Sequence, residues 1–150
     1  MKGELLINGM DAWETWGVNM GEDFLNVIDG FAPMKDFIEN ESRLEHGKRV
    51  IYAEPKIASR DLTLSFTIKG KNTYDFRAKR KAFETELYKG KIEVVIPALG
   101  DDIYKLTYLG KSVSYAMNVT RTFCTISAKF EEPNPKDRMI DEEEEDDENS

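Results

Sequence analysis

Apolar and polar residues alternate strictly along one central stretch of the chain, residues 62–69, which read LTLSFTIK. A two-residue period places successive side chains on opposite faces of a β-strand. We therefore predict a strand with one buried face over this stretch. Gly70 breaks the alternation, so the strand is expected to end at about Lys69.

The segment after this strand has the pattern of an amphipathic helix. Asn72 offers a side-chain oxygen as an N-cap, and Asp75 places an acid near the positive end of the helix. The apolar residues at 76, 83 and 87 fall close to one side of a helix with about 100° per residue. Gly90 is suited to the left-handed conformation that ends a helix. The sequence thus predicts a helix from about Asn72 to Lys89.

Other stretches combine apolar or β-branched residues with turn residues on both sides, as strands do. They are 5–7, 17–20, 34–39, 91–97, 104–110, 111–117 and 119–130. About eight short strands and one helix predict a mainly β (α+β) fold. We expect a β-sandwich or a partly open barrel, with the helix from about Asn72 to Lys89 on its flank.

The polar stretch 40–56 has a turn pair, His46-Gly47, at its centre. Arg43 and Leu44 precede the turn, and Arg49 to Tyr52 follow it. Connections longer than about 12–15 residues without structure are uncommon in compact domains unless they have a function. We expect a projecting hairpin or a long loop here that contacts a partner.

The negative charge of the chain is concentrated at its C-terminal end. The formal net charge is -8, and residues 141–148 alone hold eight acids, which leaves 21 basic and 21 acidic residues in positions 1–140. A dense block of like charge repels itself, so residues 136–150 are expected to form a disordered acidic tail after a folded domain 1–135. The tail is either a solubilising spacer or a segment with a specific role, such as mimicking the charge of nucleic acid or docking on a basic surface.

Few residues in the chain point to catalysis. The sequence has one cysteine, Cys124, and one histidine, His46, and Cys124 alternates in phase with apolar residues of the last predicted strand. A nucleophilic thiol needs a base beside it, and a thiolate metal site needs further ligands. We therefore expect no catalytic residue, metal site or cofactor, and the chain is not predicted to be an enzyme.

Trp13 and Trp16 lie close together near the N-terminus. Such a pair either packs in a core or anchors a subunit interface. The start of the chain lacks the apolar run of a secretory signal, and no apolar stretch reaches the roughly 20 residues of a membrane span. An intracellular protein without membrane contact is expected.

Several short segments of the sequence resemble those of a known group of proteins. They are Ile7-Asn8-Gly9 with Asp11, Trp16-Gly17-Val18, Pro33-Met34-Lys35, residues 60–70 (RDLTLSFTIKG), Tyr88-Lys89-Gly90 and a last strand that reaches Glu132-Pro133. Over residues 3–135 the chain resembles the ring-forming N-terminal domain of phage distal tail proteins. These belong to a β-sandwich superfamily of tail-tube and baseplate proteins.

This resemblance implies a structural role in a virion. Such domains assemble as rings, commonly hexamers, that join the tail tube to the baseplate or host-recognition apparatus, while DNA passes through the lumen without specific binding. The resemblance implies a viral protein of the tail, assembled in the bacterial cytoplasm, with itself, tail-tube and baseplate or hub proteins as partners. Many members carry a further carbohydrate-binding-like domain, where this chain has an acidic tail, so the resemblance does not extend direct binding of host sugars to this chain.

Two alternatives remain open on the sequence. One is another ring subunit of the same machine, in the tail tube or the head-to-tail connector. The other is a stand-alone β-sandwich that binds carbohydrate or protein. In the ring interpretation the subunit interface is predicted to use Trp13, Trp16, Arg43, Leu44, His46, Arg49 and Tyr52.

Overall fold

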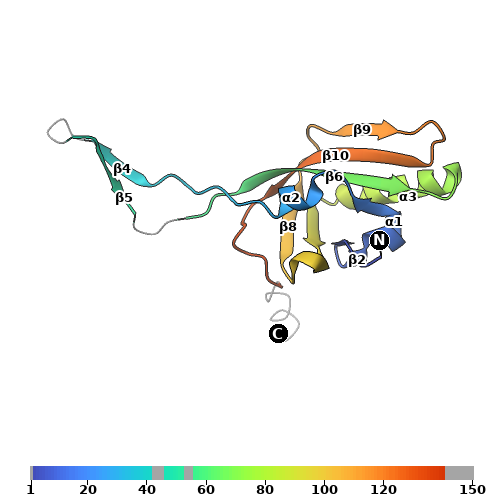
Figure 1. Ribbon diagram of the computed structural model, residues 1–150, viewed down its shortest axis with the longest axis horizontal. Coiled ribbons are helices and arrows are strands. Elements are labelled where there is room, and N and C mark those ends of the chain that lie inside the picture. Colours follow the sequence, from blue (N-terminus) through green and yellow to red (C-terminus); the bar gives the residue numbers. More distant parts are fainter. Residues whose placement is uncertain (1, 42–45, 53–55, 141–150) are drawn as a thin grey trace.

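The computed structural model of the chain describes residues 2–41, 46–52 and 56–140. Its strands are β1 Leu6–Ile7, β2 Met10–Asp11, β3 Val18–Met20, β4 Ile38–Glu41, β5 Lys48–Ile51, β6 Arg60–Lys69, β7 Lys91–Val95, β8 Ile103–Tyr108, β9 Ser114–Met117 and β10 Phe123–Glu132. Eight of these strands form one sheet in the order β2-β1-β7-β8-β10-β6-β3, with β9 paired to β10. This sheet is strongly curved and, with the helices, forms the body of the molecule (Figure 1).

The predicted mainly β fold is confirmed, and it takes the form of a partly open barrel. The alternative of two packed sheets does not describe the body, because its strands belong to one continuous antiparallel sheet. The curl lets one face of the sheet enclose the core, so that a second sheet is not needed to cover it.

Strands β6 and β10 form the spine of the sheet. They pair in antiparallel register over ten residues, from Phe123 opposite Lys69 to Glu132 opposite Arg60. Side chains in β6 are alternately buried and more exposed, which confirms the pattern predicted for residues 62–69. The register places the buried residues of both strands on the same face, as antiparallel pairing requires.

The predicted helix is α3, Thr73–Leu87. The Asn72 side chain accepts a hydrogen bond from the Asp75 amide at 2.8 Å, and Gly90 has a φ of 85°. Both ends therefore use the residues predicted for them. The buried side of α3 carries Phe76 and Phe83, which pack into the core.

Aromatic side chains join the helices to the sheet. The ring of Phe66 in β6 lies 5.2 Å from Phe24, 5.3 Å from Phe83 and 6.0 Å from Phe130, measured between ring centroids. All three contacts have the edge-to-face geometry that aromatic pairs prefer. Phe66 is thus the centre of the core.

The prediction of a single helix was wrong. The chain also forms α1, Ala12–Trp16, α2, Phe24–Ile28, and a short 3₁₀ turn, Pro97–Leu99. Asp11 caps α1 by accepting hydrogen bonds from the amides of Trp13 and Glu14, and Gly17 ends it with a φ of 65°. Helices of five residues have too few positions to show a helical period, so the hydrophobic pattern does not reveal them.

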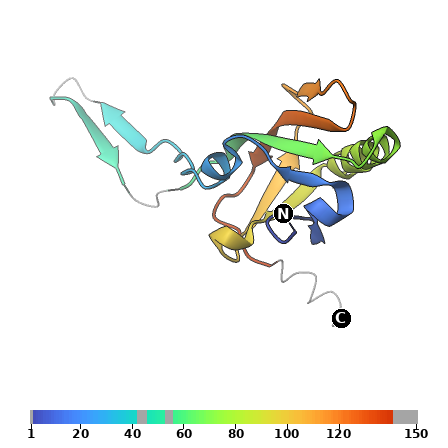
Figure 2. The same cartoon turned by 45° about the vertical axis from the view of Figure 1, so that its right-hand side comes forward.

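A second, two-stranded sheet of β4 and β5 stands away from the body (Figures 1 and 2). Between this small sheet and the body, the two segments of chain are also hydrogen-bonded to each other. The amide of Lys35 donates to the Lys56 carbonyl, and the amide of Ala58 donates to the Pro33 carbonyl. The projecting segment is therefore longer than the stretch 40–56 expected from the sequence, and we call its described residues, 31–41, 46–52 and 56–59, the arm. The strand expected at 34–39 begins at Ile38, and Met34 forms an isolated bridge with Ile57.

The body continues beyond the domain boundary expected at residue 135. The amide of Ile103 donates to the Arg138 carbonyl, and Lys105 forms an ion pair with Asp137. The chain thus remains attached to the sheet as far as Arg138. The acidic residues 141–150, assigned to a disordered tail, lie outside the described residues.

Candidate functional site

The arm is an antiparallel hairpin whose two strands are in register from Ile38 opposite Ile51 to Glu41 opposite Lys48. The Lys48 ammonium lies 2.8 Å from the Glu39 carboxylate, and both side chains are about half exposed. A surface ion pair of this kind contributes about 0–1 kcal/mol at most. Among the described residues of the hairpin, this ion pair adds little to the stability that the backbone ladder and the contact between the Phe37 and Tyr52 rings provide.

Apolar side chains are exposed along the arm. Phe31 is 100% exposed, Met34 50% and Ile57 40%, and we call these three residues the arm-root patch. Farther from the body, the ring centroids of Phe37 and Tyr52 lie 5.2 Å apart, and Tyr52 is 69% exposed. Exposed apolar residues that cluster on one element mark sites of protein association.

The structure separates the predicted interface residues into two groups. His46, Arg49 and Tyr52 belong to the arm, whereas Arg43 and Leu44 lie outside the described residues. Trp13 and Trp16 belong to α1, at the end of the body opposite to the arm (Figure 1). Within one subunit the two groups do not meet.

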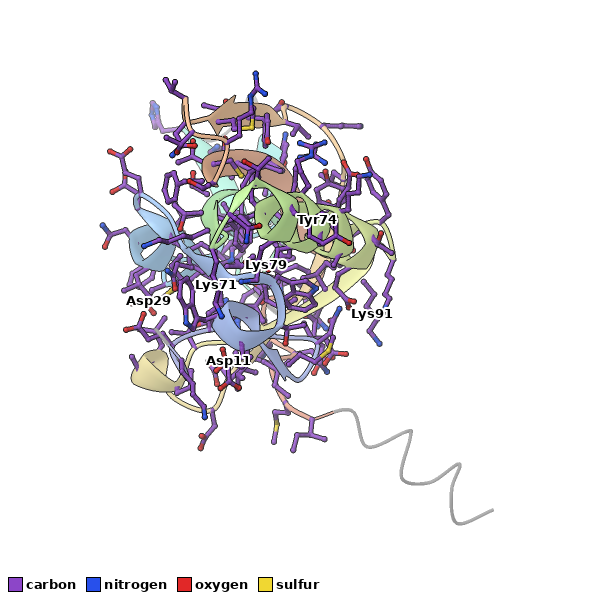
Figure 3. All side chains as sticks on the ribbon, turned by 90° about the vertical axis from the view of Figure 1, so that its right-hand side faces the viewer. Asp11, Asp29, Lys71, Tyr74, Lys79 and Lys91 are labelled. Carbon is purple, nitrogen blue, oxygen red and sulfur yellow. The ribbon has the colours of Figure 1, made fainter. Side chains whose placement is uncertain are left out.

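The two tryptophans differ in burial. Trp16 is 3% exposed and its ring lies 5.7 Å from that of Phe83, so it packs in the core. Trp13 is only partly buried, and it belongs to α1, whose start Asp11 marks in Figure 3. Of the pair, Trp13 is the residue that a partner can reach.

The arm-root patch was not singled out from the sequence. Phe31 and Met34 lie on either side of Pro33, where no alternation distinguishes an exposed apolar residue from a buried one. The turn pair Asp29-Gly30 directly before Phe31 is the signal that could have placed these residues at the start of a projection.

The cysteine and the histidine are far apart in the fold. Cys124 is fully buried in β10, whereas His46 lies exposed in the hairpin of the arm. Burial raises the pKa of the Cys124 thiol, which disfavours the reactive thiolate. The two residues therefore form no nucleophile and base pair.

A cavity of about 270 Å³ lies between α3 and β9. Its wall combines aliphatic residues with four aromatic ones, Phe83, Tyr88, Tyr108 and Tyr115. The guanidinium of Arg80 lies 5.0 Å from the centre of the Tyr115 ring, as in a cation–π contact. The lining contains one carboxylate, so the cavity does not offer the acid and base pair that hydrolysis commonly uses.

A wider and more open depression of about 780 Å³ lies beside β3 and α2 and is lined in part by Glu4 and Asp23. Across residues 2–41, 46–52 and 56–140, no group of three or more His, Cys, Asp or Glu side chains could hold a metal ion. No helix in the same residues is long and apolar enough to span a bilayer.

The sequence matches no protein-family model and no curated protein. A solved structure has a similar arrangement of strands and helices. The chain is similar in fold to SPP1 Dit. That protein, gp 19.1, is described as a paradigm of the hub adsorption apparatus in phages that infect Gram-positive bacteria. The TM-score is 0.56 at 11% sequence identity.

The similarity to SPP1 Dit covers 90% of this chain and 50% of the Dit chain, so this chain spans half of the length of its structural neighbour. At 11% identity the likeness establishes the fold. This chain thus has the fold of a phage hub protein, and the kind of fold implied by the sequence resemblance is confirmed.

Proposed function

We propose that this protein is a structural subunit of a phage or prophage tail, of the distal tail type. It would assemble as a ring, most simply a hexamer, between the tail tube and the baseplate or host-recognition apparatus. In this role the work of the chain is to bind other subunits, without catalysis, a cofactor or a membrane. Assembly in the bacterial cytoplasm would precede incorporation into the virion.

The arm is the observation that carries the proposal. A monomer gains nothing by exposing Phe31 completely and Met34 and Tyr52 by half or more. Burial of a side chain such as Phe contributes about 1.5–3 kcal/mol. The arm therefore presents binding energy that a neighbouring subunit can use. The shared fold with a phage hub protein supports the identity of that neighbour as a second copy.

The position of the arm favours a head-to-tail contact. The arm leaves one end of the body, and α1 with Trp13 lies at the opposite end (Figure 1). Two different surfaces at opposite ends form a heterologous interface, which closes into a ring when the rotation between subunits allows it. In this arrangement Trp13 of one subunit would lie near His46 and Tyr52 in the arm of the next subunit.

The charge of the chain suits a channel for DNA. Residues 1–140 are formally neutral, so the body has no excess of basic residues. A protein that neutralises phosphates binds DNA more strongly with every contact. A ring that lets a genome pass needs few such contacts. We further propose that residues 1–135 with the attached residues 136–138 are the ring-forming part, and that the acidic tail lies outside it.

The test is the state of assembly of the purified chain. Sedimentation velocity over a range of concentrations, followed by electron microscopy, should show discrete closed rings. Long stacked tubes would instead assign the chain to the tail tube. A protein that remains monomeric at every concentration would refute the ring and favour a stand-alone binding domain.

A further inference from the structure

The two ends of the arm meet at one buried side chain, Arg60. This residue begins β6, directly after the arm returns to the body, and it is 5% exposed. One of its terminal nitrogens donates to the carbonyl of Gly30 at 2.7 Å, and the other donates to the carbonyl of Ile28 at 2.7 Å. Gly30 is the last residue before the arm departs. Arg60 therefore links the point where the chain enters the arm to the point where it returns to the body.

The carbonyls that Arg60 binds need a partner. Ile28 is the last residue of α2, where the carbonyls of a helix have no intrahelical donor, and Gly30 follows two residues after the helix ends. The planar guanidinium presents donors in several fixed directions, so a single side chain can serve both carbonyls. A lysine has one ammonium at the end of a flexible stem, and it cannot reach these positions in the same geometry.

Glu132 holds Arg60 in place. The two residues are directly opposite each other in the β6 and β10 pairing, and Arg60 Nε donates to Glu132 Oε1 at 2.7 Å. Glu132 is fully buried. Its carboxylate also accepts two hydrogen bonds from Arg138, both at 3.0 Å. The hydrogen bond between Arg60 and Glu132 fixes the orientation of the Arg60 guanidinium, because it occupies Nε and leaves the two terminal nitrogens for the carbonyls. The bonds from Arg138 hold the Glu132 carboxylate in turn.

We propose that Arg60, oriented by Glu132, sets the direction in which the arm leaves the body. Arg60 and Glu132 are positioning residues: neither is on the exposed part of the arm. They hold Gly30 and the start of β6 in a single relative position, so the arm is presented at one angle. This inference rests on the proposed function, because a defined angle matters when the arm must reach a neighbouring subunit in a closed ring.

The angle can be measured with spin labels on cysteines introduced as His46→Cys in the arm and Thr63→Cys on the exposed face of β6. Cys124 is fully buried, so it stays unlabelled in the folded chain. Doubly labelled chain is diluted into an excess of unlabelled chain, so that labels in different subunits rarely meet. The distance distribution of the wild-type arm should have a single narrow peak.

We call the Arg60–Glu132 pair, with the carbonyls of Ile28 and Gly30 that Arg60 binds, the clamp. Two variants remove it. Arg60→Lys keeps the charge and loses the fork of donors. The double variant Arg60→Met with Glu132→Met removes both buried charges together, which proteins tolerate better than the loss of one partner. Both are expected to lose the single peak and to give a broad distribution. If Arg60→Lys does not fold, the double variant decides.

Two controls separate positioning from stability. Arg138→Gln removes the second guanidinium and leaves the Arg60 and Glu132 contact, so the narrow peak should remain. Leu64→Ala weakens the core without touching the clamp, because Leu64 is fully buried in β6. Its thermal midpoint should fall while the narrow peak remains.

A double variant that folds and keeps the narrow wild-type peak would overturn the inference. So would a broad distribution in the wild-type chain. The distance measurement nevertheless distinguishes a failure of this inference from a failure of the proposed function. A chain that never forms rings refutes that function and leaves the distance result intact. A chain that forms rings while the double variant keeps its arm fixed refutes the inference alone.

Discussion

Phe31→Ala is the substitution that tests most simply whether the arm is an interface. Phe31 is 100% exposed in the isolated chain, so the substitution removes no contact from the folded monomer. Surface substitutions of this kind usually change the free energy of unfolding by less than about 0.5 kcal/mol. The thermal unfolding midpoint of the monomer should therefore remain close to that of the wild type.

The expected effect on association is much larger. If Phe31 becomes buried against a neighbouring subunit, its loss removes about 1.5–3 kcal/mol from each interface. At 1.4 kcal/mol per factor of ten, this weakens each contact by about 10- to 150-fold. Rings of Phe31→Ala should accordingly need a markedly higher protein concentration to form than rings of the wild type.

Sedimentation velocity across a dilution series measures this difference, and Val119→Ala is the matched control. Val119 is 98% exposed and lies on the body between β9 and β10. Its substitution removes a similarly exposed apolar side chain that the proposal does not place in the interface. An equal loss of association in both variants would indicate general surface stickiness. Unchanged association of Phe31→Ala would refute the role of the arm-root patch.

Three further substitutions test the body. Trp16→Ala should lower the free energy of unfolding by about 3–5 kcal/mol in urea denaturation, because Trp16 is 3% exposed. Gly70→Ala should cost about 1–3 kcal/mol, since the added carbon would lie 2.5 Å from backbone atoms of α3. Burial raises the pKa of Glu86, but hydrogen bonds from Asn8 and Lys89 lower it more, so the net pKa lies below the ordinary 4.5. The ionised form of Glu86 therefore stabilises the fold at pH values above its ordinary pKa, and this contribution is lost as the pH falls through the lower pKa of the folded state. Glu86→Gln should accordingly flatten the acid side of a curve of the free energy of unfolding against pH.

Each of these substitutions has a control. Trp13→Ala, at the accessible tryptophan, should cost less stability than Trp16→Ala. Gly30→Ala should cost less than Gly70→Ala, because its added carbon would lie 3.3 Å from the nearest atom. The wild-type chain, measured in the same pH series as Glu86→Gln, should keep the steeper acid limb. A reversed order in any pair would show that the burial assigned to the first member is wrong.

Local signals in the sequence predict the centre of the fold well. The alternation at 62–69 predicts β6 because one face of that strand is buried along its whole length. Asn72 and Gly90 predict both ends of α3 because each acts on backbone groups within a few residues of itself. These features depend on neighbours in the chain, so the sequence alone reveals them.

The candidate site is harder to predict because it depends on contacts between distant residues. The turn pair His46-Gly47 indicates a hairpin, and the structure forms one. The clamp at its base joins Arg60 to Glu132, which are 72 positions apart, and it exists because β6 and β10 pair in one register. Whether Phe31 is buried or exposed is likewise decided by where the arm leaves the body.

The most direct test of the account is a cryo-electron microscopy reconstruction of the assembled protein, because it shows where each arm lies. The account predicts a closed ring in which the arm of one subunit lies against the α1 end of the neighbouring body, and that body covers the arm-root patch. A two-fold dimer that buries the same surface on both subunits, or a ring whose arms project freely into solvent, would contradict it.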